Sequence, residues 1–174
     1  QIAGFNTTNL KAVKNQLGQA SSALLLDELL VKMPITDATL QAVTGDSALT
    51  LQGAAEQGLL YACDYAMFEG LEGGTLHEAK RYPVAPIALF YWSADAPKGY
   101  PPGGALQPIA IQLGQKHDAE TTPIFTPHDE TGNNDTDGAK WKLAKIMVQN
   151  TCTIEHETVA HLGACHLVIE PMIV

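Results

Sequence analysis

The chain has 174 residues, of which 45% are apolar and 17% are charged, so one globular domain is expected and disordered and fibrous classes are excluded. Its 19 acidic and 10 basic residues give a net charge of −9, which argues against nucleic acid as a partner because phosphate backbones would be repelled. Apolar runs such as Ile87–Trp92 are far shorter than the roughly 20 residues of a membrane-spanning helix. Peripheral membrane contact stays open, and so does the compartment, whether cytoplasmic, periplasmic or secreted.

The first third of the chain is predicted to be mostly helical. Residues 7–33 begin with capping side chains, carry leucine and valine at roughly helical spacing, and end before Pro34, whose ring disfavours the helical conformation in the residue before it. Residues 36–44 predict a short helix that ends at Gly45, and residues 47–58 predict another.

Three apolar runs are predicted to form a small antiparallel sheet. Residues 59–65, 85–92 and 106–113 are rich in apolar and aromatic side chains and are bounded by glycine and proline. Residues 93–104 have the composition of a hairpin loop, which makes the second and third runs antiparallel neighbours. Pro108 in the third run predicts an edge position or the start of a strand.

The last part of the chain changes character. Residues 115–137 are polar and rich in turn-forming residues, which predicts a long exposed connection. From Gly138 onward apolar residues lie nearly all round the helical wheel, which predicts one long buried helix. The chain begins at Gln1 and stops at Val174 inside an apolar segment, so we expect a piece of a longer protein.

The cysteine pattern predicts no disulfide scaffold. Cys63, Cys152 and Cys165 form no CxxC pair, and their spacing also disfavours a thiolate metal site. We expect all three to be small buried hydrophobes.

Three of the six histidines, His156, His161 and His166, lie in the last predicted helix at the spacing H-x4-H-x4-H. Each buried imidazole needs a polar partner, so two interpretations stay open. The three rings are either hydrogen-bonded residues of the core or ligands of a metal ion.

The spacing disfavours a zinc hydrolase. HExxH zinc proteases place two histidines four residues apart, whereas the segment from His156 to His161 is one residue longer. Five α-helical residues turn about 500°, which leaves the two side chains roughly 140° apart. A π-type turn of roughly 4.4 residues brings them within about 50°. If His161 and His166 bind one metal, the helix between them is therefore predicted to be a π-helix.

Several sequence blocks match one family in the family's own order. They are Ile2-Ala3-Gly4-Phe5-Asn6, Asp64-Tyr65 after a predicted strand, Pro108–Leu113 (PIAIQL), Pro123–Pro127 (PIFTP), Trp141–Lys145 (WxxAK) and His156–Pro171, which contains HE, two HL pairs and EP. On these blocks the chain resembles the lipoxygenases, specifically part of their catalytic domain, and we expect a bacterial-type member. Thr7, Cys165 and Met172 depart from the family's usual Pro, Thr and Phe, which puts little in doubt.

The resemblance implies a mainly α fold. It would be a partial lipoxygenase-like helical catalytic domain with a small antiparallel sheet and a long buried metal-binding helix at its C-terminal end. Residues 1–174 would be an N-terminal and middle portion of that domain, with the remainder missing or on another chain.

The resemblance also implies the roles of five residues, none of them directly catalytic. His161 and His166 would ligate a non-haem iron, with manganese as the less favoured alternative. His156 would orient neighbouring groups without binding the metal. Glu157 stands where relatives often carry Gln in a hydrogen-bond network toward substrate, and a carboxylate there accepts only. Leu162 would line the fatty-acid channel, or would be ordinary core.

The activity implied by the resemblance is dioxygenation of lipids. A family member abstracts hydrogen from the cis,cis-1,4-pentadiene of a polyunsaturated fatty acid through a ferric hydroxide, and O2 then gives a conjugated hydroperoxide. The remaining part of the catalytic domain would supply a further His, an Asn and a C-terminal carboxylate, a role that Val174 does not take. An isolated fragment is expected to be inactive. The alternative is a non-catalytic structural fragment or inactive member with core histidines only.

Overall fold

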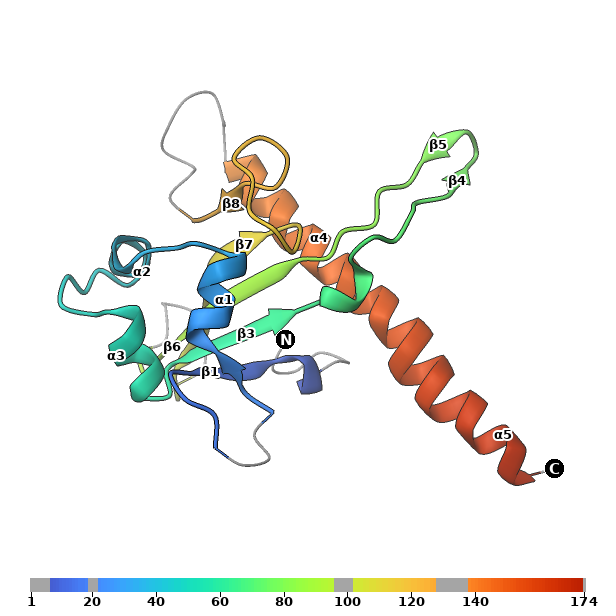
Figure 1. The fold of residues 1–174 in the computed structure, drawn as a ribbon, viewed down its shortest axis with the longest axis horizontal. Helices are drawn as coiled ribbons and strands as arrows, with labels where there is room; N and C mark the ends of the chain where they lie inside the picture. The colour runs from blue at the N-terminus through green and yellow to red at the C-terminus, as the bar shows by residue number, and fades with distance from the viewer. Residues whose placement is uncertain (1–6, 19–21, 96–101, 128–137, 174) are drawn as a thin grey trace.

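The computed structural model describes residues 7–18, 22–95, 102–127 and 138–173. A mixed sheet of six strands lies between short helices on one face and one long helix on the other (Figure 1). The expected sheet and long C-terminal helix are present, but helices and strands are mixed, so this part of the chain is not mainly α. The three predicted strands are present as β3, β6 and β7. The sheet also contains the short strands β1, β2 and β8, which the sequence pattern did not predict.

The sheet has the order β2-β1-β3-β6-β7-β8, and all neighbours are antiparallel except the parallel pair β1 and β2. A separate hairpin, β4 and β5, stands away from the body (Figure 1). The strands are β1 (Lys11–Lys14), β2 (Leu24–Leu25), β3 (Leu60–Asp64), β4 (Thr75–Leu76), β5 (Ala79–Lys80), β6 (Ile87–Ser93), β7 (Ala105–Gln112) and β8 (Ile124–Phe125).

Pro108 shows why a proline is accepted inside β7. It pairs with Phe90 at the register shift after Leu89, and β8 pairs only with Ile111 and Gln112 farther along the strand. The outer side of β7 is thus an edge at Pro108, where its missing N–H removes no sheet hydrogen bond.

Successive side chains of the central strands point to opposite faces of the sheet and pack into two separate cores. In β6, Ile87 and Leu89 pack with the short helices, while Ala88 and Phe90 pack on the opposite face with the long helix. Successive side chains of a strand point to opposite faces, so a fully apolar run such as β6 is expected where both faces are covered.

The first core is covered by three helices, α1 (Leu26–Lys32), α2 (Asp37–Thr44) and α3 (Leu51–Glu56). The predicted helix 36–44 is confirmed, with Gly45 in the left-handed region at φ 75° as its C-cap. The helix predicted over 47–58 is shorter, because Thr50 caps it by accepting a hydrogen bond from the Gly53 N–H at 3.0 Å.

The single helix predicted over residues 7–33 is wrong. The described part of this range contains a 3₁₀ turn η1 (Thr7–Asn9), the strands β1 and β2, and only then α1. Val13 is fully buried because β1 pairs with β3, which is a long-range contact. Helical spacing of leucines is a local signal, and pairing with a buried strand overrides it.

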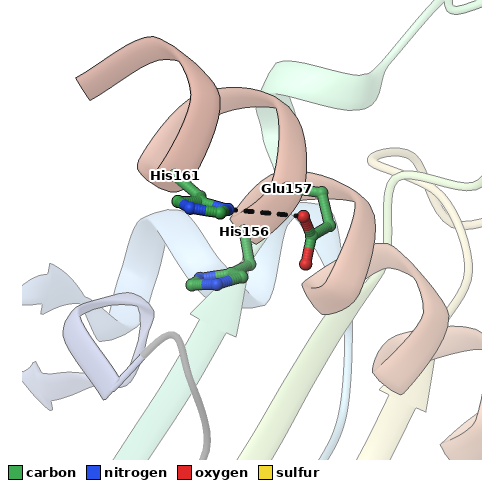
Figure 2. A group of neighbouring side chains, drawn as sticks. All are labelled: His156, Glu157 and His161. Carbon is green, nitrogen blue, oxygen red and sulfur yellow. Dashed lines mark hydrogen bonds and ion pairs between the residues drawn. The ribbon is translucent and has the colours of Figure 1, made fainter. Parts of the chain in front are cut away.

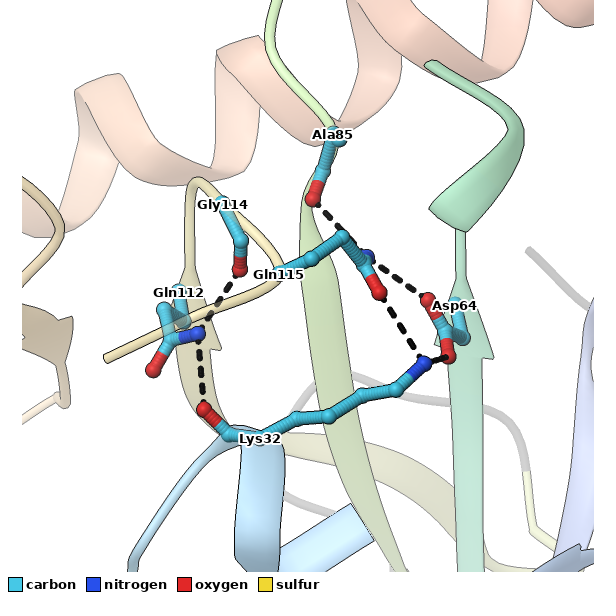
Figure 3. Close-up of polar contacts among 6 residues, drawn as sticks. All are labelled: Lys32, Asp64, Ala85, Gln112, Gly114 and Gln115. Carbon is cyan, nitrogen blue, oxygen red and sulfur yellow. Dashed lines mark hydrogen bonds and ion pairs between the residues drawn. The ribbon is translucent and has the colours of Figure 1, made fainter. Parts of the chain in front are cut away.

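A polar network fastens α1 to the sheet (Figure 3). Lys32 Nζ donates to Asp64 Oδ2 at 2.7 Å and to Gln115 Oε1 at 3.0 Å. Gln115 Nε2 donates to Asp64 Oδ1 at 2.8 Å and to the Ala85 carbonyl at 3.1 Å. Beside it, Gln112 Nε2 donates to the carbonyl of Lys32 at 3.0 Å. The network joins the C-terminal end of α1 to the ends of β3 and β7.

The long helix covers the second core with its first half only. It runs without a break through α4 (Ala139–Glu155), a π-helix η5 (His156–His166) and α5 (Leu167–Ile173), and its second half extends away from the sheet (Figure 1). In α4 the buried side chains repeat every three or four residues and face the sheet: Trp141, Ala144, Val148, Thr151, Cys152 and Glu155.

Within the described chain this helix is buried in α4 only, and no residue of η5 or α5 is buried, so the burial of its second half stays a prediction for a longer protein. Its apolar side chains there are exposed by 40–79%: Val159, Leu162, Leu167, Val168, Ile169, Met172 and Ile173. No described helix is long and apolar enough to cross a membrane.

The cysteines follow the same division. All three are free thiols, with Cys63 and Cys152 buried as predicted and Cys165 exposed, contrary to prediction. Burial raises the pKa of Cys63 to about 12, and the neighbouring Cys152 adds to this effect. Burial, with a hydrogen bond to Cys152, raises the pKa of Tyr65. The buried Cys63 thiol is therefore an inert packing group.

Candidate metal centre

The helix widens over the eleven residues from His156 to His166, which form a π-helix. This confirms the geometry predicted from the five-residue spacing of the histidines. The N–H of Leu167 bonds back to the Leu162 carbonyl, five residues earlier.

Local side chains favour the wider turn. Thr158 Oγ1 donates to the Ile154 carbonyl at 2.7 Å and so competes for an acceptor of the α-helical ladder. Cys165 Sγ contacts the Ala160 carbonyl at 3.5 Å, again five residues back. Gly163 weakens an α-helix at this point, because glycine is the poorest helix former after proline.

The widened turn brings His161 and His166 together. Their Nε2 atoms lie 2.9 Å apart and their ring centroids 4.7 Å apart. With metal–nitrogen bonds of about 2.0–2.1 Å, two nitrogens at this separation subtend about 90° at a shared ion, which is the angle between neighbouring ligands of an octahedron. The pair therefore fits two adjacent positions of one metal ion.

A second group shares His161. Ligand atoms of His156, Glu157 and His161 all lie within 4.8 Å of one another (Figure 2). Glu157 Oε2 is 3.5 Å from His161 Nδ1, and the rings of His156 and His161 are stacked, with centroids 5.6 Å apart and planes 19° apart. Glu157 thus faces Nδ1 of the His161 ring, whereas His166 faces its Nε2.

The five predicted site residues thus lie on one segment, but only four of them converge. His156 is half-buried, whereas the side chains of His161 and Glu157 are 47% and 61% exposed. Leu162 follows the first predicted ligand and is 48% exposed. Among the described residues Leu162 lines no channel, so its channel role stays a prediction.

The sequence did not reveal the contact that lies next to the start of the π-helix. Asn9 Nδ2 donates to Glu155 Oε2 at 3.1 Å across 146 residues of sequence, and Glu155 is only 8% exposed. A carboxylate directly before His156 on an otherwise apolar face was the one available signal, and no spacing rule identifies its partner. The same holds for Lys32, Asp64 and Gln115, which are brought together from separate elements.

Comparison with known proteins identifies the family and the fold. The lipoxygenase family model matches residues 38–174. The rat arachidonate 12-lipoxygenase of the 12R type is 34% identical over 139 residues, which are 80% of this chain and 17% of that protein. The structure of a calcium-dependent 11R-lipoxygenase superposes with a TM-score of 0.66 at 27% identity, covering 93% of this chain and 20% of that one.

A manganese lipoxygenase has a TM-score of 0.57 at 22% identity and covers 90% of this chain and 21% of its own, a likeness that shows the fold alone. The chain therefore spans about a fifth of the length of these proteins. The expected bacterial type stays a prediction. The family model covers most of the chain, and relatives at 34% identity and solved lipoxygenase structures agree with it: the chain belongs to the lipoxygenase family.

Proposed function

We propose that the protein is a metal-dependent dioxygenase that adds O2 to polyunsaturated fatty acids with a cis,cis-1,4-pentadiene, and that this chain carries part of its metal site. The observation that carries the proposal is the pair of Nε2 atoms 2.9 Å apart on the π-helix. Two lone pairs do not face each other at that distance without a proton or a cation between them. Family membership makes the cation the better candidate.

The residues present fit a non-haem metal. Neutral imidazoles suit iron(II), and mixed nitrogen and oxygen ligands with an open position are typical of non-haem oxygen chemistry. His161 and His166 would hold the ion, and iron is proposed ahead of manganese because most of the family uses it. When bound, iron supplies one-electron oxidation of the weak bis-allylic C–H bond and conversion with O2 to a conjugated hydroperoxide.

The chain's own side chains would then position the His161 ring and shield the site from water. The ring of His156 stacks on His161 and limits its rotation. Leu162, next to the first ligand, would present apolar surface to the fatty-acid tail and exclude water, as ligand sites of this kind require. No residue of this chain is proposed to transfer a proton to or from the substrate.

The rest of the catalytic domain is the proposed partner. An apolar surface as continuous as that of η5 and α5 is unusual on a monomer and marks a face that is covered by another segment. Because the chain spans about a fifth of its relatives, we propose that the remainder covers this face. It would also supply a further His, an Asn and a C-terminal carboxylate. Residues 1–174 alone would hold iron weakly and be inactive.

The test uses the protein at its natural length. Elemental analysis is expected to find one iron per chain, and linoleate or arachidonate is expected to produce conjugated-diene absorbance. His161→Ala and His166→Ala should each lose the metal and the absorbance, whereas His117→Ala, an exposed histidine outside the helix, should keep both. If the protein binds manganese alone, manganese replaces iron in the proposal. A protein that binds no transition metal and forms no conjugated diene supports a non-catalytic family member instead, whereas full activity in His161→Ala refutes the proposed metal role of His161.

A further inference from the structure

His161 is contacted on two sides through its two ring nitrogens. Its Nδ1 lies 3.5 Å from Glu157 Oε2, and its Nε2 lies 2.9 Å from Nε2 of His166. A neutral imidazole carries a hydrogen on one nitrogen and a lone pair on the other. Which nitrogen carries the hydrogen therefore decides which side of His161 is able to bind a metal ion.

The geometry of Glu157 selects between the two tautomers. An ionised carboxylate only accepts hydrogen bonds, so the nitrogen of His161 that faces it is the one that carries the hydrogen. The lone pair is then on Nε2, which faces His166. The stacked ring of His156, at 19° to that of His161, opposes the ring flip that would exchange the two nitrogens.

We propose that Glu157 is a positioning residue of the metal centre. Its carboxylate holds the hydrogen on His161 Nδ1 and thereby presents the Nε2 lone pair to a divalent transition-metal ion shared with His166. The inference rests on the proposed function, because it takes these two histidines as ligands. It gives Glu157 a task on a ligand ring, separate from any contact with substrate, and Glu157 itself does not bind the ion.

The spacing supports this assignment. Glu157 and His161 are four residues apart, whereas His161 and His166 are five apart, and all three lie within the π-helix. Carboxylate–histidine–metal arrangements of this kind fix the ring orientation and raise the basicity of the ligating nitrogen. The contact of 3.5 Å is long for a hydrogen bond, and catalytic hydrogen bonds in proteins without their ligands tighten once the ligand is in place.

The first experiment measures metal affinity without catalysis. Cobalt(II) is titrated into the metal-free protein of natural length against a competing chelator. Glu157→Ala is expected to weaken binding about 10–100-fold, the usual cost of losing a residue that orients a ligand. Glu157→Gln should bind with intermediate affinity, because its amide oxygen still accepts from Nδ1–H. Glu28→Gln removes the same charge from an exposed site on α1 and should bind like the wild type.

The second experiment reads the tautomer directly. In the metal-free protein with ¹⁵N-labelled histidine, His161 should carry its hydrogen on Nδ1, and Glu157→Ala should shift the population toward Nε2–H. Cobalt should then perturb Nε2 of His161. A wild-type Nε2–H tautomer, a cobalt perturbation on Nδ1, or equal affinities for Glu157→Gln and Glu157→Ala would overturn the proposal.

The two proposals fail in different ways. If His161→Ala and His166→Ala lose cobalt while Glu157→Ala binds it like the wild type, the role of Glu157 is wrong and the metal pair stands. If the two histidine variants keep wild-type affinity, the metal pair itself is wrong. Circular dichroism of each variant shows whether the helix is retained.

Discussion

Cys63 makes the stability of this protein sensitive to alkaline pH. Burial raises its pKa from 9.0 to about 12 in the folded protein, while the unfolded thiol keeps an ordinary pKa. A group whose folded-state pKa is raised stabilises the fold fully below the unfolded pKa, and that contribution is lost as pH rises toward the folded pKa. The window is therefore pH 9 to 12. At pH 10 the unfolded thiol is about nine-tenths ionised and the folded thiol about one-hundredth, which costs about 1.4 kcal/mol of stability.

The measurement is urea unfolding under reducing conditions at pH 8 and pH 10. The wild type should lose about 1.4 kcal/mol more between the two pH values than Cys63→Ala, whose own cavity lowers stability equally at both. Cys165→Ala removes an exposed thiol and should show the wild-type pH dependence. Equal pH dependence of Cys63→Ala and the wild type would refute the reasoning, because it would mean that the folded thiol ionises as easily as the unfolded one.

Three further predictions test the packing of the long helix, the exposure of the thiols and the polar network. Val148→Ala should destabilise by about 2 kcal/mol because it removes two buried methyl groups facing the sheet, whereas Ile146→Ala on the exposed side of the same helix should change stability by less than about 0.5 kcal/mol in urea unfolding. In residues 1–174 without the proposed covering segments, Cys165 alone should react with a thiol reagent at pH 8, and mass spectrometry of the labelled peptide would show it; rapid labelling of all three thiols would contradict the burial of Cys63 and Cys152. Gln115→Ala should lower the free energy of unfolding by about 2 kcal/mol, because it removes hydrogen bonds to the charged groups of Lys32 and Asp64. Gln149→Ala, exposed on α4, is the matched control in the same assay.

The sequence predicted those parts of the fold that short-range signals determine. The helix ending at Gly45 and the strands around Cys63, Ile87 and Ile109 were found because caps, turn residues and continuous apolar runs act locally. The helix predicted over residues 7–33 is wrong in the described part of that range because β1 exists only through its pairing with β3. A strand of four residues with one buried side chain, Val13, carries almost no periodic signal of its own.

The candidate site followed the same rule. The π-helix was predictable because the five-residue spacing of His161 and His166 allows convergence in no other helical form. The exposure of that segment within residues 1–174 was not predictable. An apolar helix has the same sequence pattern whether the elements that cover it lie on the same piece of chain or elsewhere. The contact of Asn9 with Glu155 was equally out of reach, because it depends on how two distant elements are packed.

The broad turn also bears on which length changes the protein can tolerate. Removing one residue between His161 and His166 would leave a four-residue interval, and an ordinary α-helix would again place both rings on one side. Four α-helical residues turn about 400° and five π-helical residues about 410°, so later side chains would keep nearly the same directions around the axis. The imidazoles would still meet, and Leu167, Ile169 and their neighbours would present the same stripe to whatever lies against them. A one-residue gap at this point therefore spares both the candidate ligand pair and its surroundings, so histidine spacing alone is a poor guide to whether a shortened relative still binds a metal.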